Sequence, residues 1–225
     1  MKAKIGILGT GKTGGKVVEM ARTKGHEIIH LFDAANPPTL KTINECQAII
    51  AFVPGDVILS YLDLFLQSET ILISGATGFE FPNHVDSHLK NKNKRWMTSS
   101  NYSLGMSIIK NCVEIFREGA KMLNGAEFSI HEIHHTQKLD APSGTALSWQ
   151  KWLGQKANIT SERIGDVVGF REMTMETKTE VMKISHAALD RNIFAEGALW
   201  SLSLLLKDQT LPYGCLLYTS PSPRD

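Results

Sequence analysis

The segment Lys4-Ile-Gly-Ile-Leu-Gly-Thr-Gly-Lys-Thr-Gly14 decides the fold of the first part of this 225-residue chain. Its first five residues predict a buried parallel strand, since the four residues after Lys4 are apolar or glycine. Glycines at positions 9, 11 and 14 then give the G-x-G-x-x-G spacing, and a helical stretch follows from about residue 15 to residue 24. In such a segment the first glycine permits a tight turn, the second lets a pyrophosphate approach the backbone, and the third lets helix and strand pack closely. The segment therefore predicts an α/β domain that binds a dinucleotide.

An acidic residue stands where such a domain would hold the adenosine ribose. Residues 27–32 predict a second strand, which ends on Asp33, 19 residues after Gly14. A carboxylate there accepts a hydrogen bond from a free ribose hydroxyl and repels a 2′-phosphate. Ala34 follows where an arginine could have bound that phosphate, although Lys41 could still reach it. We therefore expect NADH to be preferred, with NADPH as the alternative cofactor.

Three further strands are predicted in the first half of the chain, over residues 48–53, 71–74 and 95–98. Asp56 is placed to cap a helix between the first two of them, carrying apolar residues up to Leu66. Gly75-Ala-Thr-Gly78 follows the strand over residues 71–74. Ligands bind at the carboxyl edge of an open α/β sheet, so the backbone around Gly75 and Thr77 is a candidate neighbour of the nicotinamide. The alternative is an ordinary turn between a strand and a helix.

The pattern changes near residues 99–105, where we place the one candidate linker between domains. Beyond it the sequence predicts a helix over 106–123, a strand over 126–134, a helix over 146–156, a pair of strands over 167–175 and 178–187, and a last helix over 194–206. Residues 215–225 contain two prolines and no periodicity, so we predict a disordered tail without a function. The fold class is therefore α/β, with a Rossmann-like first domain and a second α+β domain.

Proton donors gather in His131-Glu-Ile-His-His-Thr-Gln-Lys-Leu-Asp-Ala-Pro-Ser-Gly-Thr145. A histidine can move a proton near neutral pH, and a lysine can bind an anionic substrate. Ser143 is a candidate N-cap, and the backbone N–H groups that follow it would hold a carboxylate. The alternatives are a metal pair or a solvated polar loop. A metal site needs a third ligand at a characteristic spacing, and none is evident, so we predict a catalytic site without a metal.

Composition narrows the class of protein. The formal net charge of +1 gives no electrostatic case for a nucleic acid or a membrane surface as partner. Three widely spaced cysteines suit a reducing compartment. No leader precedes the first strand and no apolar run is long enough to span a bilayer, so we expect a cytoplasmic protein.

The run Glu132-Ile-His-His-Thr-Gln-Lys-Leu-Asp-Ala-Pro-Ser-Gly-Thr145 closely resembles the signature of the bacterial dihydrodipicolinate reductases, also named 4-hydroxy-tetrahydrodipicolinate reductases. The glycine-rich start, Gly75-Ala-Thr-Gly-Phe79 and Ser100-Asn-Tyr-Ser103 are similar to that family in the same order. Nearer the C-terminus, the chain is also similar to the family at His186 with Arg191, and at Phe194-Ala-Glu-Gly-Ala198. The resemblance covers about residues 4–206, and the histidine–lysine run is its most specific part.

The resemblance implies a reductase of lysine and diaminopimelate synthesis that acts on a small dicarboxylate. It implies a dinucleotide-binding domain over residues 1–103, completed by the C-terminal helix at about 193–214. It also implies a second domain over residues 104–192, whose open mixed sheet holds the substrate and builds a homotetramer. Residues 215–225 leave the family pattern.

The resemblance also implies a role for individual residues. His134 would be the proton donor, and Lys138 the second acid and the anchor of the substrate. Three residues would bind a substrate carboxylate: His135, Gly144 and Thr145. The residues expected to line the cofactor are Gly9, Thr10, Gly11, Lys12, Thr13, Gly14, Asp33, Gly75, Ala76, Thr77, Ser99, Ser100, Asn101 and Tyr102.

The chain departs from the family pattern at a few positions. Arg171 stands where the G-x-H-x-V pattern has histidine, Ala76 replaces a common threonine, and Ser100 replaces a common proline. Two rival functions stay open: another nicotinamide-dependent amino-acid or amine dehydrogenase of the same build, and a non-catalytic dinucleotide sensor. The complete histidine–lysine run argues against both.

Overall fold

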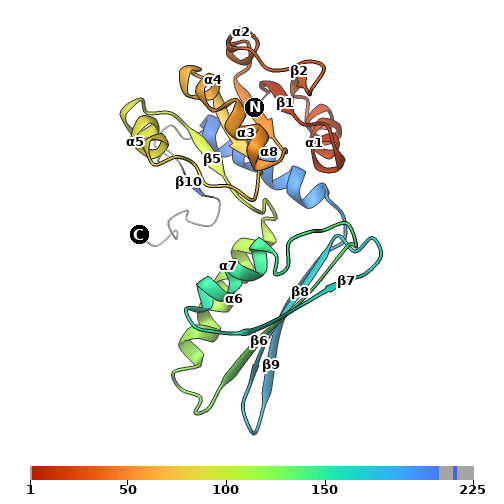
Figure 1. Ribbon diagram of the computed structural model, residues 1–225, viewed down its shortest axis with the longest axis vertical. Coiled ribbons are helices and arrows are strands. Elements are labelled where there is room, and N and C mark those ends of the chain that lie inside the picture. The colour runs from red at the N-terminus through yellow and green to blue at the C-terminus, as the bar shows by residue number, and fades with distance from the viewer. Residues whose placement is uncertain (1, 208–214, 217–225) are drawn as a thin grey trace. The chain divides into compact units, whose positions relative to one another are not determined.

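The computed structural model describes residues 2–207 and 215–216, which belong to two compact units (Figure 1). The first unit comprises Met1–Ser103 and Asn192–Asp225, and the second comprises Leu104–Arg191. Within the described residues, no helix has both the length and the apolar character needed to cross a bilayer.

The first unit is built on a parallel sheet. Its six strands are β1 (Lys4–Leu8), β2 (Glu27–Phe32), β3 (Ala48–Ala51), β4 (Ile71–Ser74), β5 (Trp96–Thr98) and β10 (Cys215–Leu216), in the spatial order β10-β5-β4-β3-β1-β2. All pairs are parallel, which confirms the predicted Rossmann-like class. The chain reverses its direction of winding between β1 and β3, and such a switch point is where open α/β sheets bind ligands.

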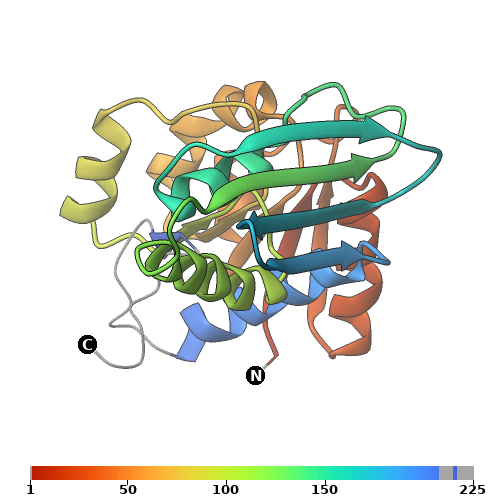
Figure 2. The ribbon, with the colours of Figure 1, turned by 90° about the horizontal axis from the view of Figure 1, so that it is seen from below.

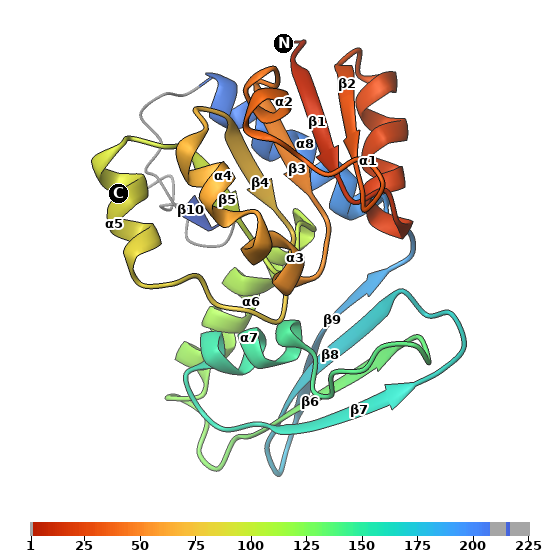
Figure 3. The same ribbon diagram turned by 45° about the horizontal axis from the view of Figure 1, so that its top comes forward.

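Helices cover both faces of this sheet, as Figure 3 shows. One face carries α1 (Lys12–Thr23) and α8 (Asn192–Lys207), which pack against each other. The other carries α2 (Leu40–Asn44), α3 (Gly55–Ser60), α4 (Leu62–Gln67) and α5 (His84–Asn91), joined to the strands in one buried cluster. Every residue of β3 and β4 is buried, because a strand covered on both faces buries successive side chains on alternate sides.

Some predicted elements of the first unit are wrong in detail. The single helix predicted after Asp56 is two short helices, α3 and α4, separated at Tyr61 with φ −105°. Pro54 is the N-cap, and Asp56 lies in the first turn instead. Cys215–Leu216 pairs with β5, so the predicted disordered tail is wrong for these two residues. Residues 208–214, predicted to extend the last helix, and residues 217–225 lie outside the described part of the chain.

The second unit is a mixed sheet with helices on one face (Figure 2). Its strands β6 (Glu127–His134), β7 (Asn158–Arg163), β8 (Gly169–Glu176) and β9 (Val181–Ala188) lie in the order β7-β6-β8-β9. Only the β6–β7 pair is parallel, which confirms the predicted open mixed sheet. Helix α6 (Gly105–Gly119) contacts β9 and α7 (Gly144–Leu153) contacts β6, and the two helices pack together.

The helix-covered face of β6 carries the candidate site. The side chains of Phe128, Ile130, Glu132 and His134 are buried, whereas the residues between them are more exposed. This alternation places two apolar residues and then two polar ones on the same face, toward the carboxyl end of the strand. The polar end of a strand that is otherwise core-forming is therefore where chemistry can occur.

Candidate active site

The glycine-rich turn of the first unit has the geometry of a phosphate cradle. Gly9 has φ +86°, and a Cβ on it would lie 2.6 Å from Cγ1 of Val53. A Cβ on Gly14 would lie 1.8 Å from the carbonyl oxygen of Gly9, so only glycine lets α1 pack this closely on β1. A Cβ on Gly11 would meet nothing within 4 Å, which leaves room for a ligand against the backbone. Each glycine thus has the place that the motif predicts.

The start of α1 completes this cradle. Gly11 is the N-cap, and no side chain caps the helix there, so the first N–H groups of the helix can bind an anion. Thr10 and Lys12 are exposed and Thr13 is half-buried at this end of the helix. These residues fit the pyrophosphate of a dinucleotide.

Asp33 lies at the carboxyl end of β2, as predicted, and is exposed. Its Oδ1 accepts hydrogen bonds from the backbone N–H groups of Ala35 and Asn36, both at 2.9 Å. These bonds fix the orientation of a carboxylate where the adenosine ribose is expected.

The turns after β4 and β5 are closely packed. A Cβ on Gly75 would lie 2.3 Å from the Phe52 ring, so this position requires glycine. Ala76 is buried and Thr77 is exposed. Their proximity to the nicotinamide stays a prediction.

Ser99, Asn101 and Tyr102 are buried, and Ser100 is exposed. The hydroxyl of Tyr102 donates to the carbonyl oxygens of Ser74 and Met97, at 3.2 and 2.8 Å, and thereby ties β4 to β5. Asn101 Oδ1 accepts from the backbone N–H of Ser103 at 2.9 Å. The side chains that we expected to line the cofactor therefore also hold this turn together.

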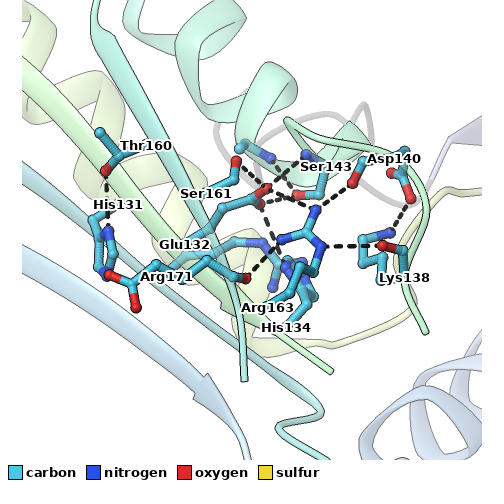
Figure 4. Close-up of polar contacts among 12 residues, drawn as sticks. His131, Glu132, His134, Lys138, Asp140, Ser143, Thr160, Ser161, Arg163 and Arg171 are labelled. Carbon is cyan, nitrogen blue, oxygen red and sulfur yellow. Dashed lines mark hydrogen bonds and ion pairs between the residues drawn. The ribbon is translucent and has the colours of Figure 1, made fainter. Parts of the chain in front are cut away.

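In the second unit the polar contacts centre on Glu132 (Figure 4). Its carboxylate is 0% exposed and accepts hydrogen bonds from the backbone N–H of Ser143 at 2.8 Å, from the hydroxyl of Ser143, and from the hydroxyl of Ser161 at 2.9 Å. Burial alone would raise its pKa, but these hydrogen bonds outweigh burial and hold the pKa of Glu132 below its ordinary value. Glu132 thus joins β6 to β7 and to the start of α7.

The hydroxyl of Ser143 accepts from the backbone N–H of Ala146 at 3.2 Å, so Ser143 is the predicted N-cap of α7. Gly144 and Thr145 form the first turn of this helix, and Thr145 is buried. An anion at this end of a helix is stabilised by backbone N–H groups and by the helix dipole. His135 is half-buried at the carboxyl end of β6.

Lys138 lies in the loop between β6 and α7, where its Nζ donates to Oδ1 of Asp140 at 2.6 Å. Arg163 at the end of β7 holds this loop: its Nε donates to the carbonyl oxygen of Lys138 at 3.1 Å, and its Nη2 donates to that of Asp140. The ammonium group of Lys138 is thus held in this loop, where it is paired with a carboxylate.

His134 is 2% exposed, and its Nε2 lies 2.6 Å from Nη2 of Arg171 on β8. A guanidinium group can only donate, so Nε2 of His134 must accept, and a neutral imidazole carries its proton on Nδ1. Nδ1 is 3.7 Å from Oε2 of Glu132. Burial and then the charge of Arg171 lower the pKa of His134 to about 4, although Glu132 opposes this change. The predicted proton donor is therefore neutral at pH 7 in this structure.

The sequence did not identify Glu132, Arg163 or Arg171 as parts of the site. Glu132 falls within the family-like run, where its alternation with His134 on one strand was a usable signal. Arg163 was not identified because the polar stretch Asn158–Arg163 did not predict a strand. Arg171 was noticed only as a departure from a pattern. In the described part of the chain, no group of three or more His, Cys, Asp or Glu side chains could hold a metal ion.

Comparisons with known proteins agree with this geometry. A family model described as "Dihydrodipicolinate reductase, C-terminus" matches residues 109–215. The 4-hydroxy-tetrahydrodipicolinate reductase of Alkaliphilus metalliredigens is 29% identical, over 92% of this chain and 95% of the relative. The enzyme of the same name from Thermosipho africanus is 28% identical, over 92% of this chain and 93% of the relative.

The fold of the chain is also similar to that of a solved structure. Dipicolinate-bound dihydrodipicolinate reductase from Paenisporosarcina sp. TG-14 superposes with a TM-score of 0.75 at 17% identity, over 95% of this chain and 98% of the other. The relatives, the family match over residues 109–215 and the histidine–lysine run, which begins on β6 and continues into the following loop, agree with one another. Over nearly its whole length the chain is similar to 4-hydroxy-tetrahydrodipicolinate reductases, also called dihydrodipicolinate reductases.

Proposed function

We propose that this chain catalyses the NAD(P)H-dependent reduction of 4-hydroxy-tetrahydrodipicolinate to tetrahydrodipicolinate, a step in lysine and diaminopimelate biosynthesis. The observation that carries the proposal is the grouping, on one unit, of a buried histidine, a lysine and the N-terminus of α7. The substrate has two carboxylates, and this grouping offers cationic and N–H donors for them.

The roles of the residues follow from the chemistry. Loss of water from the substrate gives a conjugated cyclic imine, whose reduction needs a hydride on one carbon and a proton on the next. The nicotinamide cofactor supplies the hydride when it is bound. We assign the proton to His134, and the binding of the carboxylates to Lys138, His135 and the N–H groups of Gly144 and Thr145. A substrate carboxylate would displace Asp140 from Lys138.

In the first unit we assign the pyrophosphate to residues 9–14 and the ribose to Asp33. Gly75, Ala76, Thr77 and residues 99–102 are proposed neighbours of the nicotinamide. We further propose that the first unit, with α8, is the dinucleotide-binding domain and that the second unit binds substrate. A cytoplasmic homotetramer, assembled through the sheet face of the second unit that α6 and α7 leave uncovered, completes the proposal.

The test is NADH and NADPH oxidation by the purified chain, with substrate generated in place by the preceding synthase of the pathway. Rapid oxidation that requires the synthase supports the reductase. Oxidation with amino acids or amines in place of this substrate would support a dehydrogenase of the same build. Cofactor binding without any oxidation would support a non-catalytic sensor.

Asp33→Ser is expected to lower the preference for NADH over NADPH about tenfold, because a charge-assisted hydrogen bond contributes about 1.5–3 kcal/mol and the repulsion of a 2′-phosphate is also removed. The measurement is kcat/KM for each cofactor in both proteins. Glu27→Gln, a change of charge at the other end of β2, is the matched control. An unchanged cofactor ratio in Asp33→Ser would remove Asp33 from cofactor selection.

Lys138→Ala is expected to weaken binding of dipicolinate about 10–100-fold and to lower turnover, because a charge-assisted hydrogen bond to a carboxylate is lost. Asp140→Asn is the matched variant, since it removes the internal carboxylate from the same ammonium group and should tighten binding. Calorimetric titration with dipicolinate measures both. Equal affinities in all three proteins would exclude Lys138 as the anchor.

A further inference from the structure

The contact between His134 and Arg171 conflicts with the role of His134 as a proton donor. Nε2 of His134 accepts a hydrogen bond from the guanidinium at 2.6 Å. A protonated imidazole carries a hydrogen on both nitrogens and cannot accept there. Protonation of His134 at Nε2 therefore requires Arg171 to move away from it.

The charges around His134 also oppose protonation. The groups that act on it are Arg171 on β8, Arg163 on β7, Lys138 in the following loop and Glu132 on its own strand. The one charged residue of α7, Lys151, is exposed in the last turn of that helix. Three cations thus face one carboxylate, and the second nearby carboxylate, Asp140, is paired with Lys138. A proton on His134 would add a fourth positive charge in a buried place, at high cost without an added anion.

Arg171 is well placed to respond to such an anion. It is 6% exposed and stands opposite Glu132 on one neighbouring strand and opposite His186 on the other. The hydrogen bonds to the Glu132 carboxylate come from Ser143 and Ser161, so that carboxylate has a fixed set of donors. Burial, followed by the charge of Arg171, also lowers the pKa of His186. The guanidinium of Arg171 donates to a neutral nitrogen of His134. A carboxylate of an entering dicarboxylate is a stronger acceptor than this nitrogen and would compete for the guanidinium.

We propose that Arg171 is a positioning residue that couples substrate binding to protonation of His134: a substrate carboxylate takes the guanidinium from Nε2, and this nitrogen then accepts the proton used in the reduction. The proton comes from solvent. In the reduction the N–H bond breaks and a C–H bond forms on the ring carbon next to the one that gains the hydride. The ring is reduced by two electrons, the nicotinamide is oxidised, and His134 returns to its neutral form. This inference rests on the proposed function.

The experiment is an NMR titration of the His134 ring between pH 3 and 8, with its signals assigned by their loss in His134→Gln. In the free wild-type protein we expect a midpoint near pH 4, and a midpoint above pH 5.5 once dipicolinate is added. In Arg171→Gln we expect the midpoint of the free protein to lie about 1–3 pH units higher than in the wild type, which is the usual effect of one neighbouring charge. Lys183→Gln removes a charge from the exposed side of β9 and should change nothing.

Arg171→His is the second variant if Arg171→Gln does not fold, and Arg171→Lys should restore part of the wild-type behaviour. The basic limb of the pH profile of kcat should move in the same direction as the NMR midpoint. An unchanged midpoint in both variants, or a midpoint in the wild type that dipicolinate does not raise, overturns the proposal. Failure of the proposed function has a different signature, because a chain without reductase activity still reports the effect of Arg171 on His134 in the free protein.

Discussion

His134→Gln is expected to lower kcat by about 10²–10⁴-fold, the usual contribution of a general acid, while the affinity for NADH stays unchanged. Glutamine has about the size of histidine, and its side-chain oxygen can accept the hydrogen bond that Arg171 now donates to Nε2. The variant should therefore keep the packing of β6 and lose only the group that carries the proton. Steady-state kinetics and cofactor titration measure the two quantities separately.

A matched control lies on the same strand. His131 is half-buried on the other face of β6, where its Nδ1 lies 3.0 Å from the hydroxyl of Thr160. His131→Gln removes an imidazole three residues away, so its turnover should equal that of the wild type. Equal turnover in His134→Gln and the wild type would exclude His134 as the donor, and a similar loss in both variants would indicate damage to the sheet.

The pH dependence of the free energy of unfolding should also depend on His134. The pKa of His134 is lowered to about 4 by burial and by Arg171, so the unfolded chain binds this proton more readily than the folded one. His134 contributes stability fully above its unfolded pKa of about 6.5, and that contribution is lost as pH falls towards 4. We therefore expect His134→Gln to lose less stability than the wild type between pH 6.5 and 4.5, as measured by hydrogen exchange of the β6 amides in the second unit. Parallel curves for the two proteins would contradict this assignment.

The first unit could be predicted well because local geometry dictates its sequence. Gly9 and Gly14 have no room for a Cβ, and β3 and β4 are buried along their whole length and apolar except for Ser74, because both their faces are covered. Errors arose where tertiary packing overrides a local signal. The periodicity that predicted one helix after Asp56 continues through Tyr61, although the chain breaks there into two helices.

In the second unit, by contrast, the local sequence does not show the contacts on which the candidate site depends. The run from residue 131 to residue 145 predicts the candidate site, but the contacts within that site involve partners distant in sequence, such as Arg171, which lies 37 residues from His134. Nothing in the local pattern shows that β8 pairs with β6 in the register that brings these two side chains together. The edge strand β7 is polar because it is exposed, so it lacks the alternation that predicts a strand. The sequence therefore predicted where the candidate site lies, and only the sheet register showed that the guanidinium of Arg171 contacts the predicted proton donor.

Glu132→Ala is expected to destabilise the second unit by about 3–5 kcal/mol, the usual cost of removing one partner from a buried set of charges and hydrogen bonds. The change leaves the N–H and hydroxyl of Ser143 and the hydroxyl of Ser161 without this acceptor, and Arg171 without the carboxylate opposite it. Because the chain has two units, global unfolding would mix their transitions. Hydrogen exchange of the β6 and α7 amides reports on the second unit alone.

Glu132→Gln separates the charge from the hydrogen bonds. Its amide oxygen can still accept from the backbone N–H of Ser143, so the loss should be smaller than in Glu132→Ala. The pKa of Glu132 lies below its unfolded value, so the carboxylate stabilises the fold above about pH 4.3, and this contribution is lost as pH falls through the folded pKa. Exchange rates in Glu132→Gln should therefore depend less on acid than those of the wild type. A loss below about 1 kcal/mol in Glu132→Ala would mean that Ser143 and Ser161 find water as a substitute, and that β6 and α7 are held together by their apolar contacts instead.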